Sequence, residues 1–541
     1  MSLRRWSPTH TSWLWLTCFF LVSVAHFASF DLRRQPIGTD IRFYLYYAAR
    51  TADGDVPYVD FFEHKTPLAI YAGALLHKTG EVLGVDSLYV IRAGYLLLAS
   101  ITATVMGAIL VRLFNNRPMA GWFGVLAYCG FGLLGVMPAA GNIPKQIGML
   151  CAGLAILAVY RQKWFWAGIW AGIAGLDWQP CGALAGMGVI VAACVQNGRA
   201  RRLILSTIGM IVPFVPLLVY FASIGALRVL LDSIIFTSLT KASADPVPFA
   251  ERVKSIVLLL REYTADSEWL VLAAVAGTLI CTVSLFRFRS HATRPVLLAF
   301  AVYHYGIIAF TLTDFQGLGD LFVLVGTLAP FAAVCCAGLF FCSLKRLRKA
   351  RRKIPALAPR VFVLATFALL VLFVRPSFLR EGWRVNQPPI GPFGSELQAQ
   401  RNLADRLFQV VEDRSILLVR QQELLYLDGR VNCAPFVTWN QGTYSHWREG
   451  DESLIDTFVR MARPFDPDAV IVSPQWFPEL ARSALGDWLL PNYRCLQISS
   501  DDETYQTLVW YRRGLPIPTV PNVRFLNPAV FGRMSQTDAP K

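Results

Sequence analysis

Charged residues are scarce in this chain, and the common sequence motifs of soluble enzymes are missing. Only 16% of its 541 residues are charged, whereas 55% are hydrophobic. A soluble enzyme of this length needs more charged surface. The sequence has no HExxH, Walker A or GxSxG motif, and its seven histidines stand singly. These absences argue against a soluble enzyme and against a metal site built from histidine.

The eleven cysteines show neither a CxxC spacing nor a Cys/His metal spacing. Most of them stand in apolar segments, where a thiol behaves as a small hydrophobic group. Cys433 and Cys495 are the two in a polar region. If that region lies outside the cytoplasm they could form a disulfide, and their spacing leaves the question open.

One apparent cofactor motif is explained better by helix packing. Residues 130–135 read GFGLLG, which matches the dinucleotide pattern GxGxxG. That pattern requires a strand before it and the start of a helix after it, whereas these glycines lie in an apolar run. Close helix packing is the better interpretation, and it also fits two further glycine pairs, Gly168/Gly172 and Gly182/Gly186.

What the chain has in abundance is long apolar runs, each about long enough to cross a bilayer as a helix. They predict a polytopic α-helical membrane protein. The net charge of +15 comes mainly from short basic clusters between these runs, so nucleic acid is not an expected partner. The eleven predicted spans cover residues 11–30, 87–111, 119–138, 147–160, 164–177, 181–196, 203–225, 267–286, 295–313, 320–344 and 359–375. The fifth and sixth of them are short, so the count around residues 164–196 stays open.

The basic clusters predict the orientation of the chain. Those near residues 112–117, 161–163, 199–202, 287–294 and 345–353 all fall on one side, which the positive-inside rule makes cytoplasmic. The N-terminus is then cytoplasmic too. Arg33 and Arg34 are the exception, and we interpret them as snorkelling or as binding an anion. The first apolar segment could be a signal peptide, but an uncleaved helix is preferred because no clean small-residue cleavage site follows it.

The composition divides the chain into two domains. Residues 1–375 form the predicted transmembrane domain, with an outer loop at residues 31–86. Residues 376–541 have the composition of a soluble domain and follow the last span to the outer face. Short β-prone runs at residues 416–419, 469–472 and 507–511 alternate there with helical segments at 397–411 and 454–462, which predicts a small extracytoplasmic α/β domain. Its proline-rich tail after Arg513 lacks periodicity and is expected to be extended.

Polar interruptions gather on the same outer face. They include PAAGNIPKQ at residues 138–146, LDWQP at 176–180 and TDFQGLGD at 313–320. Lys145 and Asp177 stand beside apolar segments, where an unpaired charge costs several kcal/mol near the bilayer core and about 1 kcal/mol or less at its edge. They either mark helix ends or belong to a binding site.

The outer loop carries the most informative constellation. Asp40 precedes a segment predicted as an amphipathic helix lying in the membrane interface. Glu63, His64 and Lys65 stand at the other end of the loop. An acid and a cation at the membrane surface suit a lipid phosphate as substrate, although Asp40 could also serve only as a helix N-cap. The apolar face of the helix consists of Ile41, Tyr44, Leu45 and Ala48.

These residues also carry a family resemblance. The run D-x-x-x-Y from Asp40, followed by GDVPYVDFFEHKTPL at residues 54–68, resembles the first outer loop of bacterial GT-C glycosyltransferases of the protein-mannosyltransferase and aminoarabinose-transferase type. GLDWQP at residues 175–180 is similar to that family's helix break, which usually reads Lys-Gln-Pro, so Trp178 stands where the lysine is expected. The resemblance implies a multi-pass protein with an outer active site and a C-terminal extracytoplasmic α/β domain. No cofactor is expected.

The resemblance also implies residue roles. Such enzymes move a sugar from a polyprenyl phosphate to an acceptor hydroxyl with inversion at the anomeric carbon, which requires a base and cations for the departing phosphate. Asp40 matches the catalytic base. Lys65 matches the phosphate-binding lysine, with His64 beside it, and Glu63 could orient Lys65. From their charge and position alone, Lys145, Arg33 and Arg34 are weaker phosphate-binding candidates. Asn142, Asp177 and Gln179, which stand in the polar interruptions, complete the substrate-binding candidates.

Departures from the family pattern bear on metal use and on the substrate. Where relatives often carry Asn followed by an acid, this chain has Asn142, Lys145 and Gln146, so a divalent metal is possible but not supported. No Trp-Trp-Asp signature occurs, which disfavours transfer of a preassembled glycan. Two alternatives stay open: a transporter or flippase for a lipid-linked sugar, and a non-catalytic sugar-binding scaffold.

Overall fold

In the computed structural model, the chain folds into two compact units. Unit 1 comprises Met1–Leu32, Ile91–Tyr220 and Val247–Gln387, and unit 2 comprises Arg33–Val90, Phe221–Pro246 and Pro388–Lys541. The structure describes residues 10–526 with the exception of 34, 39, 238–247, 265–267, 288–293, 316, 351–396, 420, 437–448, 450–451, 472–482, 502–505 and 518.

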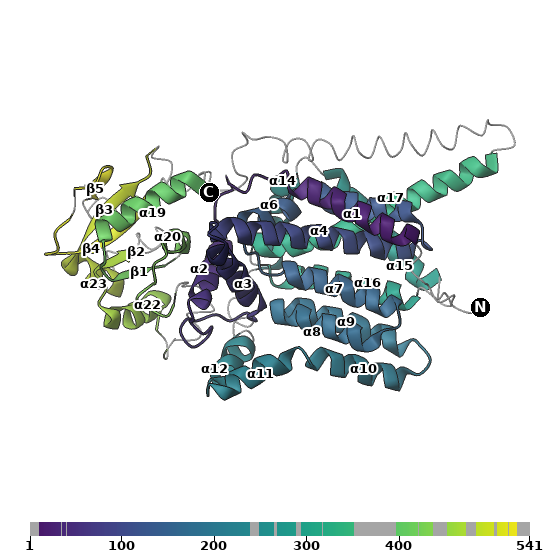
Figure 1. Cartoon of the computed structure of the whole chain (residues 1–541), viewed down its shortest axis with the longest axis horizontal. Helices are drawn as coiled ribbons and strands as arrows, with labels where there is room; N and C mark the ends of the chain where they lie inside the picture. The colour runs from purple at the N-terminus through teal and green to yellow at the C-terminus, as the bar shows by residue number, and fades with distance from the viewer. Residues whose placement is uncertain are drawn as a thin grey trace. The chain divides into compact units, whose positions relative to one another are not determined.

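Unit 1 is helical throughout its described residues. Helix α8 packs against α7, α9 and α10, α16 packs against α9 and α7, and α17 packs against α5 and α15 (Figure 1). The elements are α1 (His10–Phe27), α4 (Ser87–Leu113, entering from unit 2), α5 (Pro118–Gly130), α6 (Leu133–Ala140), α7 (Gln146–Tyr160), α8 (Trp164–Asp177), α9 (Gln179–Cys194), α10 (Arg199–Ile211), α11 (Phe214–Ser223, continuing into unit 2), α14 (Phe249–Thr264), α15 (Glu268–Arg287), α16 (Arg294–Thr313) and α17 (Leu318–Ala350).

Among the described residues, four helices are long and apolar enough to cross a membrane. They lie in α4, α15, α16 and α17. Two pairs, α5 with α6 and α10 with α11, pass the same test together but bend by 59° and 40° at a short break. The class of multi-pass helical membrane protein is therefore confirmed, whereas the predicted number of eleven spans is not.

The difference in number has a physical reason. Three predicted spans correspond to α7, α8 and α9, which have only 15, 14 and 16 residues. A helix of that length is about 21 to 24 Å long, less than the hydrocarbon thickness of a typical bilayer. The predicted span at residues 119–138 is broken between α5 and α6, at the glycine-rich stretch GFGLLG. The last predicted span, 359–375, lies outside the described residues.

The predicted role of glycine in close helix packing is confirmed. A Cβ atom on Gly168 would lie 2.1 Å from the carbonyl oxygen of Ser206, and one on Gly172 would lie 2.4 Å from that of Met210. A Cβ atom on Gly182 would lie 2.3 Å from the Cα atom of Gly175. Since no side chain fits there, these glycines let α8 approach α10 and α9 closely.

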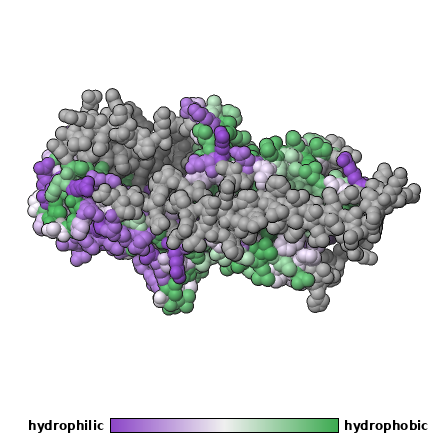
Figure 2. Space-filling view, turned by 90° about the horizontal axis from the view of Figure 1, so that it is seen from above, coloured by the Kyte–Doolittle hydropathy of each residue, from purple (hydrophilic) through white to green (hydrophobic). Residues whose placement is uncertain are grey.

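Large apolar side chains are exposed on the outer faces of the unit 1 helices. Leu272 in α15 is 71% exposed and Ile204 in α10 is 59% exposed. Figure 2 shows apolar surface beside polar surface on one face of the molecule. Soluble proteins rarely expose many such residues on neighbouring helices, so these faces fit contact with lipid.

Unit 2 combines the outer loop with the C-terminal residues. Helix α2 packs against α3 and α20, and α19 packs against α20. The helical elements are α2 (Ile41–Ala52), α3 (Leu68–Leu83), α12 (Leu227–Leu231), η1 (Asp232–Phe236), α19 (Leu397–Val411), α20 (Gln422–Asp428), α22 (Leu454–Ala462), η4 (Arg463–Phe465) and α23 (Ala484–Asn492). Figure 1 labels α2 and α3, which come from the outer loop, and α19, α20, α22 and α23, which come from the C-terminal residues.

A five-stranded sheet forms the centre of the C-terminal part of unit 2. Its order is β1-β2-β4-β3-β5, with β1 and β2 parallel and the other pairs antiparallel. Strands β1 and β2 are buried along their whole length, and Trp510 of β4 is fully buried. The strands are β1 (Ile416–Leu418), β2 (Ala469–Ile471), β3 (Tyr493–Ser499), β4 (Gln506–Arg512) and β5 (Val523–Leu526).

This sheet confirms the predicted C-terminal α/β domain. The predicted β-prone runs correspond to β1, β2 and β4, and the predicted helices to α19 and α22. The prediction missed β3, and it treated the tail as extended without recognising that Val523–Leu526 pairs with β3. The predicted domain boundary at residues 375–376 lies outside the described residues. Residues 33–90 group with the C-terminal part instead of with the helices that follow them.

Candidate functional site

Asp40 stands at the beginning of α2, but its side chain makes no capping hydrogen bond to that helix. Its Oδ2 atom lies 3.3 Å from the Nζ atom of Lys65. The side chain of Asp40 is 40% exposed and that of Lys65 is 18% exposed. The structure thus brings the two ends of the outer loop together, and a helix cap alone does not describe the part that Asp40 plays.

The backbone of Lys65 is held from two sides. Its N–H donates to Oε1 of Glu63 at 3.0 Å, and its carbonyl oxygen accepts from the hydroxyl of Tyr58 at 2.7 Å. The ammonium group lies 5.6 Å from the centre of the Tyr44 ring, a cation–π distance. Lys65 is therefore placed by contacts with both its main chain and its side chain.

Glu63 is a buried acid with several donors around it. Its Oε1 atom accepts the backbone N–H of His64 at 2.8 Å and lies 3.2 Å from Nδ1 of that residue. Burial raises the pKa of Glu63 above its usual value, whereas the nearby Lys65 and the two backbone donors oppose this shift. The predicted role of Glu63 in orienting Lys65 agrees with this geometry and stays a prediction.

Aromatic rings pack against one another within the outer loop. The rings of Tyr47 and Phe61 stack at 4.7 Å with an interplanar angle of 7°. Arg50 lies 5.3 Å from the centre of the Phe61 ring and forms an ion pair with Asp55. These contacts bury most of α2, including Tyr46 and Tyr47 as well as its predicted apolar face.

The C-terminal part of unit 2 contacts the same loop. The N–H of Phe62 donates to the carbonyl oxygen of Pro435 at 3.0 Å, and the N–H of Asn432 donates to the hydroxyl of Tyr46 at 2.8 Å. The Asn432 side chain in turn bonds the backbone of Leu418 in β1. The residues just before Glu63 are thus fixed by the sheet domain.

A second polar cluster lies in unit 1. Lys145 is 3% exposed, and its Nζ atom lies 2.5 Å from Oδ1 of Asp320 in the first turn of α17. The same ammonium lies 4.6 Å from the centre of the Trp178 ring. Lys145 precedes α7 and has a left-handed φ of 86°. A buried ammonium requires such a partner because an unpaired charge there is costly.

Asp177 closes the end of α8 and joins it to α7. It is 1% exposed, and its Oδ2 atom accepts the N–H of Gly148 at 2.7 Å. A carboxylate at the N-terminus of a helix binds donors that have no partner within the helix. Lys145 and Asp177 do mark helix ends, as one of the two predicted interpretations had it, and both are buried as well.

The remaining predicted residues divide between the units. Asn142 is fully buried in unit 1, and Gln179 begins α9. Arg33 is exposed in unit 2, whereas Arg34 lies outside the described residues. The predicted site residues therefore fall into two groups: Asp40, Glu63, His64, Lys65 and Arg33 in unit 2, and Asn142, Lys145, Asp177 and Gln179 in unit 1.

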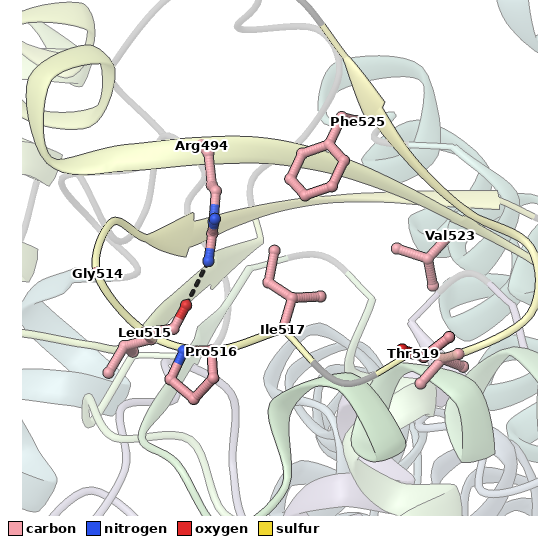
Figure 3. A pocket seen from close by; sticks show the side chains of 9 residues that line it. Arg494, Gly514, Leu515, Pro516, Ile517, Thr519, Val523 and Phe525 are labelled. Atoms are coloured by element: carbon pink, nitrogen blue, oxygen red, sulfur yellow. Dashed lines mark hydrogen bonds between the residues drawn. The ribbon is translucent and has the colours of Figure 1, made fainter.

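A cavity of about 620 Å³ lies on the sheet domain and contains none of the predicted residues. Arg494 projects into it from β3 and donates to the carbonyl oxygen of Leu515 (Figure 3). Its guanidinium group lies within 6 Å of two rings, those of Tyr511 and Phe525. Apolar side chains line most of the remaining wall.

The described residues form no metal-binding cluster, and the two cysteines of the polar C-terminal region are not reactive thiols. Within the described part of the chain, no three His, Cys, Asp or Glu residues are grouped so that they could hold a metal ion. Cys433 and Cys495 are free thiols. Burial raises the pKa of both thiols to about 12, so they are poor nucleophiles near neutral pH.

Sequence reasoning missed two residues of these clusters. Tyr58 lies within the family-like motif but was given no role, and Asp320 was noted only as part of a polar interruption. A lysine among apolar residues requires an acid, but many acids occur on the predicted outer face and Asp320 lies 175 positions from Lys145, so the sequence did not identify it. No sequence signal reports that Tyr58 bends back toward Lys65.

Comparisons with known proteins bear on the fold. No protein-family model and no curated protein matches the chain. It is similar to ArnT from Cupriavidus metallidurans bound to undecaprenyl phosphate, with a TM-score of 0.57 and 16% identity over 94% of this chain and 100% of that one. The apo state of the same protein gives a TM-score of 0.54 and 16% identity over 92% and 98%.

A third solved structure is an oligosaccharyltransferase from Archaeoglobus fulgidus in complex with Zn and sulfate. It has a TM-score of 0.49 and 11% identity, over 94% of this chain and 74% of that one. The two ArnT structures show that this chain has a GT-C-like glycosyltransferase fold over nearly its whole length. The predicted fold class is thereby confirmed.

Proposed function

We propose that this protein is an inverting glycosyltransferase that moves a monosaccharide, a hexose or a pentose, from a polyprenyl-phosphate donor to an acceptor hydroxyl. The observation that carries the proposal is the pairing of Asp40 with Lys65 at 3.3 Å. A base and a phosphate-binding cation side by side are what this transfer requires. The fold supports the proposal, because the ArnT structure that it resembles has undecaprenyl phosphate bound.

In the proposed reaction the acceptor oxygen attacks the anomeric carbon while Asp40 takes the hydroxyl proton. The bond between that carbon and the phosphate oxygen breaks, and its electron pair leaves with the polyprenyl phosphate. Lys65 stabilises the negative charge on this leaving group. Attack from the face opposite the phosphate inverts the anomeric configuration.

The ion pair implies that the donor binds before Asp40 takes the proton. Asp40 and Lys65 neutralise each other at 3.3 Å, so the carboxylate is held by the ammonium. A donor phosphate competes with Asp40 for Lys65 and releases the carboxylate to act as a base. Proton abstraction then depends on donor binding, which limits side reactions when no sugar is present.

Other residues take supporting parts in the proposal. His64 would contact the same phosphate, because it directly precedes Lys65 in the sequence and its side chain is partly exposed, at 14%. A phosphate at Lys145 would have to displace Asp320, so Lys65 is the preferred anchor. The further substrate-binding candidates are Glu63, Asn142, Asp177, Gln179, Arg33 and Arg34. No metal is part of the proposed mechanism.

The proposed setting is the bacterial cytoplasmic membrane, with the reaction on its outer face. The N-terminus would then be cytoplasmic, residues 1–375 would contain the membrane-spanning helices, and residues 376–541 would lie outside the membrane together with the outer loop at residues 31–86. The acceptor is a protein, a lipid or a glycan. The basic clusters between the apolar segments support this orientation.

Replacement of Asp40 tests the proposal. We expect Asp40→Asn to lower kcat for sugar transfer by at least about 100-fold, because the amide cannot take a proton. We expect Lys65→Ala chiefly to weaken binding of the polyprenyl-phosphate donor. Both would be measured with the purified, folded protein, by transfer of radiolabelled sugar and by equilibrium binding.

Matched control variants are available in the same unit. Asp53→Asn changes an exposed acid at the end of α2, and Lys78→Ala changes an exposed lysine of α3. Both should leave transfer unchanged. Transfer by Asp40→Asn at the parent rate would refute the base assignment. Movement of the lipid-linked sugar across liposomes without any transfer would favour the flippase alternative instead.

A further inference from the structure

Tyr58 adopts a backbone conformation that aromatic residues rarely take. Its φ is 70°, in the left-handed region, although it is neither glycine nor asparagine. The residue is only 6% exposed. Strain of this kind persists only where surrounding contacts enforce it, and it is concentrated at functional sites.

Local hydrogen bonds show what the strained conformation achieves. The N–H of Tyr58 donates to the carbonyl oxygen of Phe61 at 2.8 Å, and the N–H of Asp60 donates to that of Val56 at 2.9 Å. The chain therefore turns tightly between residues 56 and 61. This turn directs the Tyr58 side chain back toward the residues that follow Phe62.

The hydroxyl of Tyr58 then reaches Lys65. It donates to the carbonyl oxygen of Lys65 at 2.7 Å, while Glu63 accepts the N–H of Lys65 at 3.0 Å. Two side chains thus fix the Lys65 backbone: Tyr58 binds its carbonyl oxygen, and Glu63 binds its N–H group. The Tyr58 ring is itself fixed by the ring of Phe221, whose centre lies 5.8 Å away.

We propose that Tyr58 is a positioning residue that fixes Lys65 where it meets the donor phosphate. The inference rests on the proposed function of Lys65. A lysine side chain has many rotamers, so the place of its ammonium depends on a fixed backbone as well as on Asp40 and the Tyr44 ring. Without the Tyr58 hydroxyl the Lys65 carbonyl loses its donor, and the ammonium samples more positions.

The test is a double-mutant cycle on donor binding by the full chain in detergent. The dissociation constant of a polyprenyl phosphate would be measured for the parent, Tyr58→Phe, Lys65→Ala and the double variant. We expect Tyr58→Phe to weaken binding about threefold to tenfold, as for the loss of one hydrogen bond. In the Lys65→Ala background the same change should have no further effect, because the two residues act as one unit.

A control variant removes a hydroxyl of the same kind elsewhere. Tyr305 in α16 donates to the carbonyl oxygen of Thr278 at 3.0 Å. Tyr305→Phe should leave the dissociation constant unchanged. Melting temperature and gel filtration would confirm that each variant is folded. If Tyr58→Phe does not fold, Tyr58→His keeps a ring whose nitrogen falls short of Lys65, and it should weaken binding to a similar degree.

The possible failures can be told apart. If Lys65→Ala binds the lipid as well as the parent does, the proposed function of Lys65 is wrong and the inference falls with it. If Lys65→Ala weakens binding but Tyr58→Phe or Tyr58→His does not, only the positioning role is wrong. Weakening by Tyr58→Phe that simply adds to that of Lys65→Ala would indicate a general structural role and overturn the inference.

Discussion

At the scale of one residue, Glu63 is an ionisable side chain that the outer loop buries. The side chain is buried among aromatic rings, yet it accepts two backbone N–H groups and lies next to His64. Burial outweighs these donors and raises the pKa of the carboxyl group. The folded protein therefore binds a proton on Glu63 more tightly than the unfolded chain does.

This shift predicts the direction of a pH effect. The contribution of Glu63 to stability is fully present below its unfolded pKa of 4.5 and is lost as the pH rises through the raised pKa of the folded state. Glu63→Gln cannot ionise. We expect its melting temperature, relative to that of the parent, to rise by about 2 °C or more between pH 4 and pH 8, measured by thermal unfolding in detergent.

Glu81→Gln is the control for that measurement, because Glu81 is an exposed acid of α3 whose pKa is lowered by Lys78. Its stabilising effect is present above the unfolded pKa and lost at lower pH, so the trend should be weak and of opposite sign. A flat difference between Glu63→Gln and the parent across this pH range would contradict the prediction.

The residues of the site were only partly predictable. Asp40 and Lys65 were expected at the two ends of one loop, and the structure pairs them. Tyr58 could not be foreseen, because its contact with Lys65 depends on a left-handed φ that sequence does not indicate for an aromatic residue. The ion pair between Lys145 and Asp320 could not be predicted for another reason, because 175 positions separate the two residues in the sequence.

At the scale of elements, the short helices of unit 1 are joined at their ends by buried charges. Lys145 at the start of α7 contacts Asp320 at the start of α17, and Asp177 at the end of α8 binds the first turn of α7. These contacts satisfy polar groups that a broken helix leaves inside an apolar unit. The breaks are therefore built into the fold.

Removing one member of the buried pair should be costly. We expect Lys145→Met or Asp320→Leu alone to destabilise the protein by about 3 to 5 kcal/mol, because each leaves a buried charge without its partner. The double variant should recover most of the loss. The measurement is the melting temperature of the four proteins in the same detergent.

Exposed pairs provide the comparison for that cycle. Lys78 and Glu81 also form an ion pair, but on the surface of α3, where such a pair contributes little. Equal effects of the single variants in the two cycles would mean that Lys145 and Asp320 are not a desolvated pair.

The elements themselves were largely predictable from periodicity and length. Apolar runs gave the helices of unit 1, and the glycine pairs gave the close contacts of α8. The number of spans stays a prediction, because composition does not distinguish a helix of 15 residues from one that crosses a bilayer. β5 was missed because Val523–Leu526 acquires its pattern only by pairing with β3.

At the scale of the whole molecule, unit 2 is assembled from three separate stretches of chain. Gln400 of α19 exchanges two hydrogen bonds of 2.8 Å with the backbone of Ile37, and α20 packs against α2. Sequence patterns are local, so they could not show that the outer loop and the C-terminal residues share a core.

This sharing predicts the effect of truncation. A chain that ends at residue 387 keeps Asp40 and Lys65 but uncovers the side of α2 that α20 covers. We expect it to lose at least about tenfold in affinity for a polyprenyl phosphate and to become sensitive to protease within residues 33–90. The full chain with the same tag is the control, and donor binding by the truncated chain at full strength would contradict the prediction.

The hydrogen bonds between Ile37 and Gln400 also determine how late in translation the packing of unit 2 can be completed. The two residues are 363 positions apart. At about 5 to 20 residues per second, the ribosome needs roughly 20 to 70 s to make the second after the first. During that time the first loop waits in the membrane without the partner that completes its packing. A chain whose translation stops early would thus carry every proposed catalytic group and still lack a finished site, so the last part of the protein to be made decides when it becomes active.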